Sequence, residues 1–176
     1  MESQEIVNGW LAETGRLAGT ALQLDANGQV CFAYAQQTPV TVSVVEGSPY
    51  VVLYAPVLAI FDMDPPLLQE LLVLALAYNL PGGLKAGLSL AADEDAEHLY
   101  LVTQQDISSL NVSLFQSMLT DFMAQAQLLG QELQQRVRDL EMPTPPLPHQ
   151  DSGYKVASST AEAILHLRRS PSQLWG

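Results

Sequence analysis

The sequence predicts an α+β fold, an antiparallel twisted sheet flanked by helices in α-β-β-β-β-α-β-β-α order. Apolar residues recur at helical spacing near the N-terminus and again along a long segment that ends near residue 141. Between these segments, short apolar runs alternate with turn residues, as in a strand meander. Hydrophobic residues make up 48% of the 176 residues, which is enough to form a core.

The first element is an amphipathic helix over residues 3–18, and its apolar stripe includes Trp10 and Leu11. Glu2 and Glu5 are placed to interact favourably with the positive end of its dipole. We expect this helix to have one buried side and one solvated side.

A strand meander follows the first helix. Apolar runs at residues 22–24 and 30–35 surround an Asn-Gly turn and predict a hairpin, and residues 40–44 and 50–55 predict two more strands. Alternation puts Phe32 with Tyr34, and Val42 with Val44, on shared faces of the sheet. The sequence does not determine which of these faces is open.

Asp64-Pro65-Pro66 opens the next helix, residues 67–78, which is apolar nearly all round. It is either a core helix covered by its own chain or the interface of a two-fold homodimer. We favour the dimer, because exposing several leucines would forgo free energy comparable with the stability of a domain. The candidate interface residues are Leu67, Leu68, Leu71, Leu72, Leu74, Leu76 and Tyr78.

Two further strands are expected at residues 87–90 and 98–102, joined by an acidic loop, and a long helix begins at Ser108 or Ser109. Residues 1–141 then form one domain, residues 142–158 a stiff proline-rich linker, and residues 159–176 a short helical tail with a capping box at its start. The tail either docks on a protein surface or stays disordered.

The charge of the chain excludes two classes of partner. The chain carries 19 acidic and 7 basic residues, and residues 1–141 alone have a net charge of −13. Nucleic acids and anionic membranes bind clustered Lys and Arg, so neither is an expected partner. The acidic N-terminus predicts no secretory signal, and a single cysteine, Cys31, fits a reducing cytoplasm.

The sequence carries no pattern typical of an active site. Cys31 lies within a predicted strand without basic neighbours, and His98, His149 and His166 lie in three separate segments without metal-ligand spacing. The acidic loop places His98 where a calcium-binding loop needs Gly. No phosphate-binding loop, dinucleotide fingerprint or nucleophile elbow occurs. We therefore expect no enzyme activity, no cofactor and no metal.

With this element order, acidic charge and lack of catalytic groups, residues 3–140 resemble the class I type III secretion chaperones and are similar to the Tir-chaperone family. The resemblance implies a homodimer, built by residues 67–78 and the strands after them, in the bacterial cytoplasm of a pathogen, with a role in virulence. It implies that the N-terminal region of one or more secreted effector proteins is held extended and secretion-competent, without ATP, and passed to the secretion ATPase.

The resemblance also implies apolar effector-binding patches on the first helix and the meander. The candidates are Trp10, Leu11, Phe32, Tyr34, Val42 and Val44, and for each the alternative is a core position. The proline-rich linker and the tail depart from the family pattern. The alternative function is a non-secretory dimeric scaffold or regulatory binding protein with the same fold.

Overall fold

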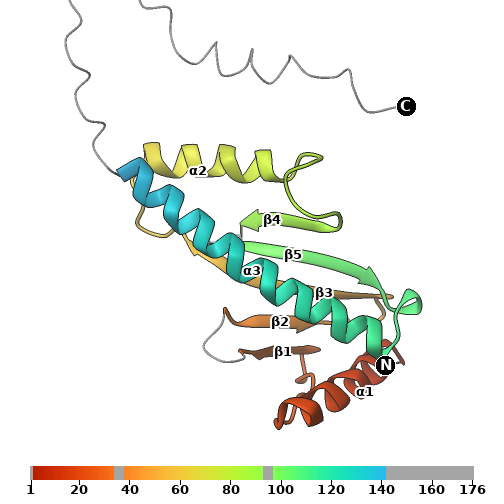
Figure 1. Cartoon of the computed structure of the whole chain (residues 1–176). Coiled ribbons are helices and arrows are strands. Elements are labelled where there is room, and N and C mark those ends of the chain that lie inside the picture. Colours follow the sequence, from red (N-terminus) through yellow and green to blue (C-terminus); the bar gives the residue numbers. More distant parts are fainter. Residues whose placement is uncertain (1, 34–37, 93–96, 142–176) are drawn as a thin grey trace, which may run out of the picture. The chain divides into compact units, whose positions relative to one another are not determined.

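A computed structural model describes residues 2–33, 38–92 and 97–141 (Figure 1). Within these residues, three α-helices and a five-stranded antiparallel sheet confirm the predicted α+β class. Tyr34, most of the acidic loop, the linker and the tail lie outside the described residues.

Helix α1, Glu2–Ala18, is joined to the sheet region by its N-terminal half. Gln4 donates a hydrogen bond from Nε2 to the carbonyl of Val44 at 3.0 Å, and Asn8 Oδ1 accepts one from the amide of Leu24 at 2.8 Å. Val7 and Leu11 are fully buried beneath the helix. These contacts fix the first half of α1 against the meander.

The meander has three strands rather than four: β1, Gln29–Phe32; β2, Val40–Ser43; and β3, Tyr50–Ala59. The strand expected at residues 22–24 is absent, although Leu22 and Leu24 are buried. The amide of Leu24 is bonded to the side chain of Asn8. This hydrogen bond to a side chain of α1 therefore takes the place of the strand pairing expected at Leu24.

The expected Asn-Gly turn is present. Gly28 has φ +74°, and the Asp25 carboxylate accepts hydrogen bonds from the amides of Asn27 and Gln29, both at 2.9 Å. A side chain that accepts these amides stabilises a tight turn, and glycine adopts positive φ at little cost.

The sheet order is β1-β2-β3-β5-β4, and every described pairing is antiparallel. Strand β4 is Leu88–Ala92 and β5 is His98–Asp106, and β5 pairs with β3 along most of its length. A bulge between Pro56 and Leu58 shifts the register of that pairing. Strands β1 and β4 form the two edges.

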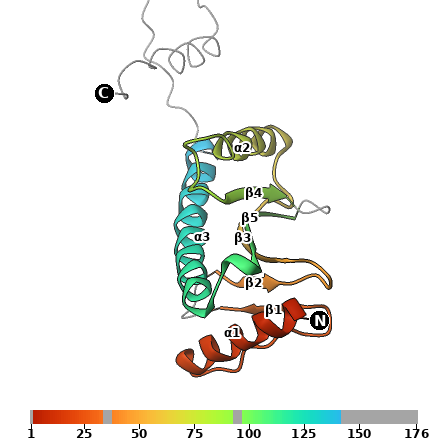
Figure 2. The same cartoon turned by 90° about the vertical axis from the view of Figure 1, so that its right-hand side faces the viewer.

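Helix α3, Val112–Glu141, crosses one face of the sheet (Figure 2). It begins a few residues later than expected, because Ile107–Ser109 form a 3-10 turn and Asn111 Oδ1 caps the amide of Leu114 at 3.0 Å. A Cβ on Gly130 would lie 3.1 Å from the carbonyl oxygen of Val57, so this glycine allows close packing on β3. The buried stripe of α3 is Phe115, Leu119, Phe122, Ala126, Leu129 and Leu133.

Helix α2, Pro65–Tyr78, lies beyond β4, at the opposite end of the sheet from α1 in both views (Figures 1 and 2). The side chain of Asn79, which follows α2, bonds both backbone groups of Leu90, donating to its oxygen at 2.9 Å and accepting from its nitrogen at 2.7 Å. The Asn79 side chain thus makes the two hydrogen bonds that a neighbouring strand would make to Leu90 at the β4 edge.

Candidate functional site

A groove of about 820 Å³ lies between α1, α3 and the end of β1, and we call it the α1–α3 groove. Its walls come from segments about 100 residues apart in the chain. The lining residues are Thr14, Leu17, Ala18, Thr20, Leu22, Phe32, Ala33, Gln116, Leu119, Thr120, Met123, Ala124 and Gln127.

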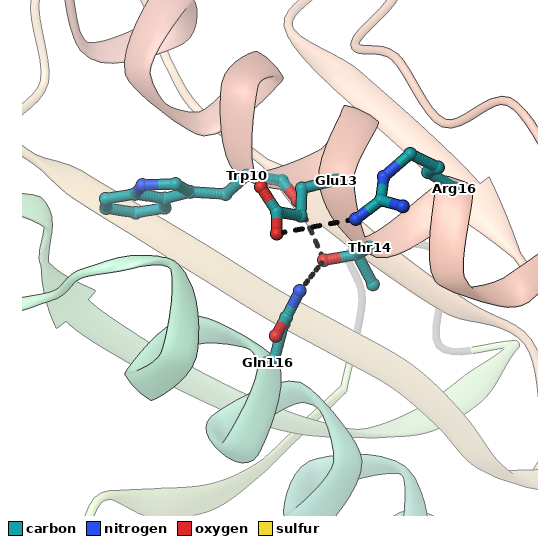
Figure 3. Close-up of polar contacts among 5 residues, drawn as sticks. All are labelled: Trp10, Glu13, Thr14, Arg16 and Gln116. Atoms are coloured by element: carbon teal, nitrogen blue, oxygen red, sulfur yellow. Dashed lines mark hydrogen bonds and ion pairs between the residues drawn. The ribbon is translucent and has the colours of Figure 1, made fainter.

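The two helices touch at one end of this groove (Figure 3). The rings of Trp10 and Phe115 pack with centroids 5.4 Å apart. Gln116 donates from Nε2 to Thr14 Oγ1 at 3.3 Å, and the Thr14 hydroxyl donates to the carbonyl of Trp10 at 2.7 Å. These contacts hold α1 near α3 at that end.

The far wall of the groove depends on how α1 ends. Gly19 adopts φ +70°, and the amide of Thr20 donates to the carbonyl of Gly15 at 2.9 Å, so the chain turns back beneath the helix. A Cβ on Gly15 would lie only 2.5 Å from the Thr20 oxygen. The absence of a side chain at Gly15 therefore lets Thr20 and Leu22 line the groove.

Among the residues that the structure describes, none that lines the groove is charged, although the chain has 19 acidic and 7 basic residues. The hydroxyls of Thr14 and Thr120 donate to backbone carbonyls of their own helices, at 2.7 and 2.9 Å. Two of the polar lining groups are thus engaged within the protein. The groove offers a mainly apolar surface to a ligand, and apolar burial contributes about 25 cal/mol per Å².

The charged pair nearest to the contact between the helices is Glu13 with Arg16, whose side-chain atoms approach to 3.8 Å (Figure 3). Both side chains are more than half exposed. Such exposed pairs contribute little stability. They border the α1 wall and are not part of the lining.

The structure separates the predicted effector-binding residues into two groups. Phe32 lines the groove, and Trp10 is half-buried where α1 meets α3. Leu11, Val42 and Val44 are fully buried in the core, which was the alternative stated for them, so they offer no surface to a client in this conformation.

The sequence interpretation missed most of the groove. Of the lining residues, only Phe32 was among the predicted effector-binding residues. A signal was present in α3, since Gln116, Thr120, Met123, Ala124 and Gln127 form an uncharged stripe beside the buried one.

Beside the groove, β1 forms an edge of the sheet. The carbonyl oxygen of Gly28 accepts a hydrogen bond from the amide of Val44 at 2.8 Å, on the side of β2. The carbonyl oxygen of Gln29 instead accepts from the amide of Asp25, in the turn before β1. Antiparallel alternation then directs the backbone groups of Cys31 outward. An extended peptide could add there by strand pairing.

Helix α2 has an inner side and a bare side. Leu71 is fully buried, and Leu67, Leu68, Leu74 and Tyr78 are half-buried against the core. The exposed side, which we call the α2 outer face, consists of Leu72, Val73 and Leu76 on the helix and Leu80 just after it, with exposed fractions from 38% to 67%.

Of the predicted interface residues, Leu72 and Leu76 therefore lie on the α2 outer face, whereas Leu71 faces the core of its own chain. The Tyr78 hydroxyl donates to the Glu132 carboxylate on α3, and burial together with this bond raises the pKa of Tyr78 to about 12. Val73 and Leu80 belong to the bare surface but were not among the predicted residues.

The described residues contain no group of three or more His, Cys, Asp or Glu side chains placed to hold a metal ion. In the same part of the chain, no helix is both long and apolar enough to cross a membrane.

The described residues thus form an antiparallel sheet crossed by one long helix, with an uncharged groove and an open strand edge. The model of the Tir chaperone protein (CesT) family matches residues 9–129, and the chain belongs to this family. The predicted resemblance is therefore confirmed. No curated protein sequence matches the chain significantly.

Solved structures with a similar fold include a chain of the ExsC–ExsE complex, with a TM-score of 0.61 and 21% identity over 74% of this chain and 95% of that chain. A chain of the HopA1–SchA chaperone–effector complex has a TM-score of 0.57 and 17% identity, covering 74% of this chain and 98% of that chain. A chain of the heterodimeric ExoU–SpcU complex from the type III secretion system of Pseudomonas aeruginosa has a TM-score of 0.52 and 19% identity, covering 72% of this chain and 96% of that chain.

Proposed function

We propose that this chain is a type III secretion chaperone of the bacterial cytoplasm that binds the N-terminal region of one or more effector proteins. It holds that region extended and secretion-competent and delivers it to the secretion ATPase. The observation that carries the proposal is the uncharged α1–α3 groove on a domain of the Tir chaperone family.

In this proposal the groove and the β1 edge hold different parts of the client. An apolar client segment lies in the groove, in contact with Phe32 and close to Trp10. An extended client strand pairs with β1 at Cys31. Ordering the client costs roughly 2–5 kcal/mol, and at about 25 cal/mol per Å² some 200 Å² of buried apolar surface offsets the upper value.

We also propose a two-fold homodimer in which the α2 outer face meets its own copy. Val73 and Leu76 are 61% and 67% exposed, and they lie one helical turn apart on α2. Patches of this kind on a single chain mark interaction sites. A two-fold axis covers the patch with an identical surface.

The proposed division into a chaperone domain at 1–141, a linker at 142–158 and a helical tail at 159–176 remains a prediction. The linker and the tail lie outside the described residues.

The test compares three forms of the tagged full chain in the native cell: wild type, Leu17→Glu and Leu128→Glu. Leu17 lines the groove and is 67% exposed, whereas Leu128 is 60% exposed on α3 and does not line it. Both glutamates should leave the fold intact, because neither replaces a buried side chain. Captured proteins are identified by mass spectrometry, and their secretion is measured.

We expect the wild type and Leu128→Glu to retain a secreted protein through its N-terminal region, and Leu17→Glu to lose it together with that protein's secretion. A groove-dependent partner that is never secreted would favour the scaffold or regulatory alternative. Equal capture by all three forms would place the binding surface elsewhere.

A further inference from the structure

We propose that a continuous series of aromatic rings on the open face of the sheet binds an extended, arginine-rich segment of a partner polypeptide. This series, which we call the aromatic row, consists of Tyr54, Tyr100, His98 and Phe61. The row lies on the side of the sheet away from α3, so it is separate from the α1–α3 groove. The proposal therefore goes beyond the proposed function and does not depend on it.

The alternation of the strands places the row on the uncovered face of the sheet. In β5, Leu99 and Leu101 are buried, whereas His98 and Tyr100 are half-buried. Leu101 faces α3, since it lines a small cavity together with residues of that helix. Tyr54 is likewise half-buried between buried neighbours in β3. In Figure 2, α3 lies on one side of the sheet, and no described helix covers β3 and β5 on the other side.

The spacing of the rings matches that of side chains along an extended peptide. The ring centroids of Tyr54 and Tyr100 are 6.0 Å apart, those of Tyr100 and His98 are 6.0 Å apart, and those of His98 and Phe61 are 6.4 Å apart. Side chains on one side of an extended chain repeat every two residues, or about every 6.6 Å. A peptide with arginine at every second position can therefore bring one guanidinium group to each ring.

Phe61 is the most accessible ring of the row. Its side chain is 64% exposed. The amides of Ile60 and Phe61 donate to the carbonyl oxygen of Glu97 at 2.8 and 3.3 Å, which holds Phe61 beside the start of β5. An exposed aromatic side chain on an ordered backbone can contact a partner without first losing backbone freedom.

The charge of the sheet region favours a cation as the group that the rings receive. All five strands lie between Arg16 and Arg136, and in that interval Lys85 is the only Lys or Arg. Lys85 lines the cavity on the α3 side, away from the row. A guanidinium group is attracted to the face of an aromatic ring and stacks on it more readily than an ammonium group does. The negative field of the chain adds a longer-range attraction for basic segments.

The experiment measures how the full chain binds fluorescent peptides in which arginine alternates with serine. Fluorescence anisotropy gives the dissociation constants for the wild type, Phe61→Leu, Tyr100→Leu and Tyr50→Leu, none of which differs in charge. Tyr50 is the matched control, because it is a 40% exposed tyrosine of β3 that is not part of the row. Two further peptides replace every arginine by citrulline, which is neutral, or place all the arginines in one block.

We expect Phe61→Leu and Tyr100→Leu each to weaken binding of the alternating peptide by about two- to fivefold, and Tyr50→Leu to leave it unchanged. The citrulline peptide should lose most of its affinity, because its side chains carry no cation. The block peptide should bind the wild type more weakly than the alternating peptide, because fewer of its arginines lie on one side. Circular dichroism checks the fold, and the exposed position of Phe61 keeps the test valid if Tyr100→Leu does not fold.

Four results would overturn the proposal. The alternating peptide could fail to bind, or it could bind the row variants as tightly as Tyr50→Leu, which would mean that net charge alone attracts it. Equal affinity for the citrulline peptide would show that the row receives a neutral chain. A sedimentation mass that differs between Phe61→Leu and the wild type would show that a second copy covers the row. None of these results bears on the α1–α3 groove.

Discussion

Replacing Leu76 by Glu on the α2 outer face should dissociate the proposed homodimer. Complete burial of a leucine contributes about 1.5–3 kcal/mol. Leu76 is 67% exposed in the single chain, so its share on dimerisation is about 1–2 kcal/mol. A two-fold dimer buries Leu76 of both chains, so the total contribution to the free energy of dimerisation is about 2–4 kcal/mol. Its loss corresponds to a dissociation constant roughly 30- to 1,000-fold weaker. The buried carboxylates add to the effect.

Mass measurements by light scattering and sedimentation over a concentration series provide the assay. Leu128→Glu is the matched control, because Leu128 is 60% exposed but lies on α3. The wild type and the control should sediment as dimers at micromolar concentration, and Leu76→Glu as a folded monomer by circular dichroism. A monomeric wild type, or a Leu76→Glu variant as dimeric as the control, would refute the reasoning.

Three further predictions concern stability. Gly9→Ala should stabilise the fold by up to about 1 kcal/mol, because the new Cβ meets nothing within 4 Å. Gly15→Ala in the same helix should destabilise the fold, because the new Cβ would lie 2.5 Å from the Thr20 oxygen. Urea unfolding that ranks the stabilities of the two variants the other way would contradict this. Asn79→Ala should cost about 1–3 kcal/mol in the same assay, because both backbone groups of Leu90 lose their partner. The pKa of Tyr78 is raised to about 12, so its contribution to stability is fully present below pH 10 and is lost as the pH rises toward 12. Ultraviolet titration should show one tyrosine that ionises near pH 12 and is missing in Tyr78→Phe, and the same titration curve for both proteins would disprove the assignment.

The fold class was predictable because periodicity and turns are local properties. The helical spacing of α1 and α3 and the turn at Gly28 depend on neighbouring residues only. The strand expected at residues 22–24 could not be excluded in this way, because a side chain from α1 binds the amide of Leu24. That competition depends on tertiary structure.

The site was harder to predict for the same reason. Alternation placed Val42 and Val44 on one side of the chain but could not show that both are buried in the core, Val42 in β2 and Val44 just after it. The groove brings together Thr14, Phe32 and Gln116, which lie far apart in the sequence. Only the packing of α1 beside α3 makes these residues neighbours.

The positions of α1 and α2 at opposite ends of the sheet have a consequence for avidity (Figure 1). Strands lie about 4.8 Å apart and a helix adds about 10 Å, so the groove and the α2 outer face are separated by roughly 30 Å. In a dimer joined at α2, the two grooves are then roughly 60 Å apart, a span that about 20 extended residues can cover. Under the proposed function, a client of that length engages both grooves, and once the first segment is bound, the second experiences a local concentration on the order of millimolar. Two individually weak contacts would then hold a client whose separate segments exchange readily.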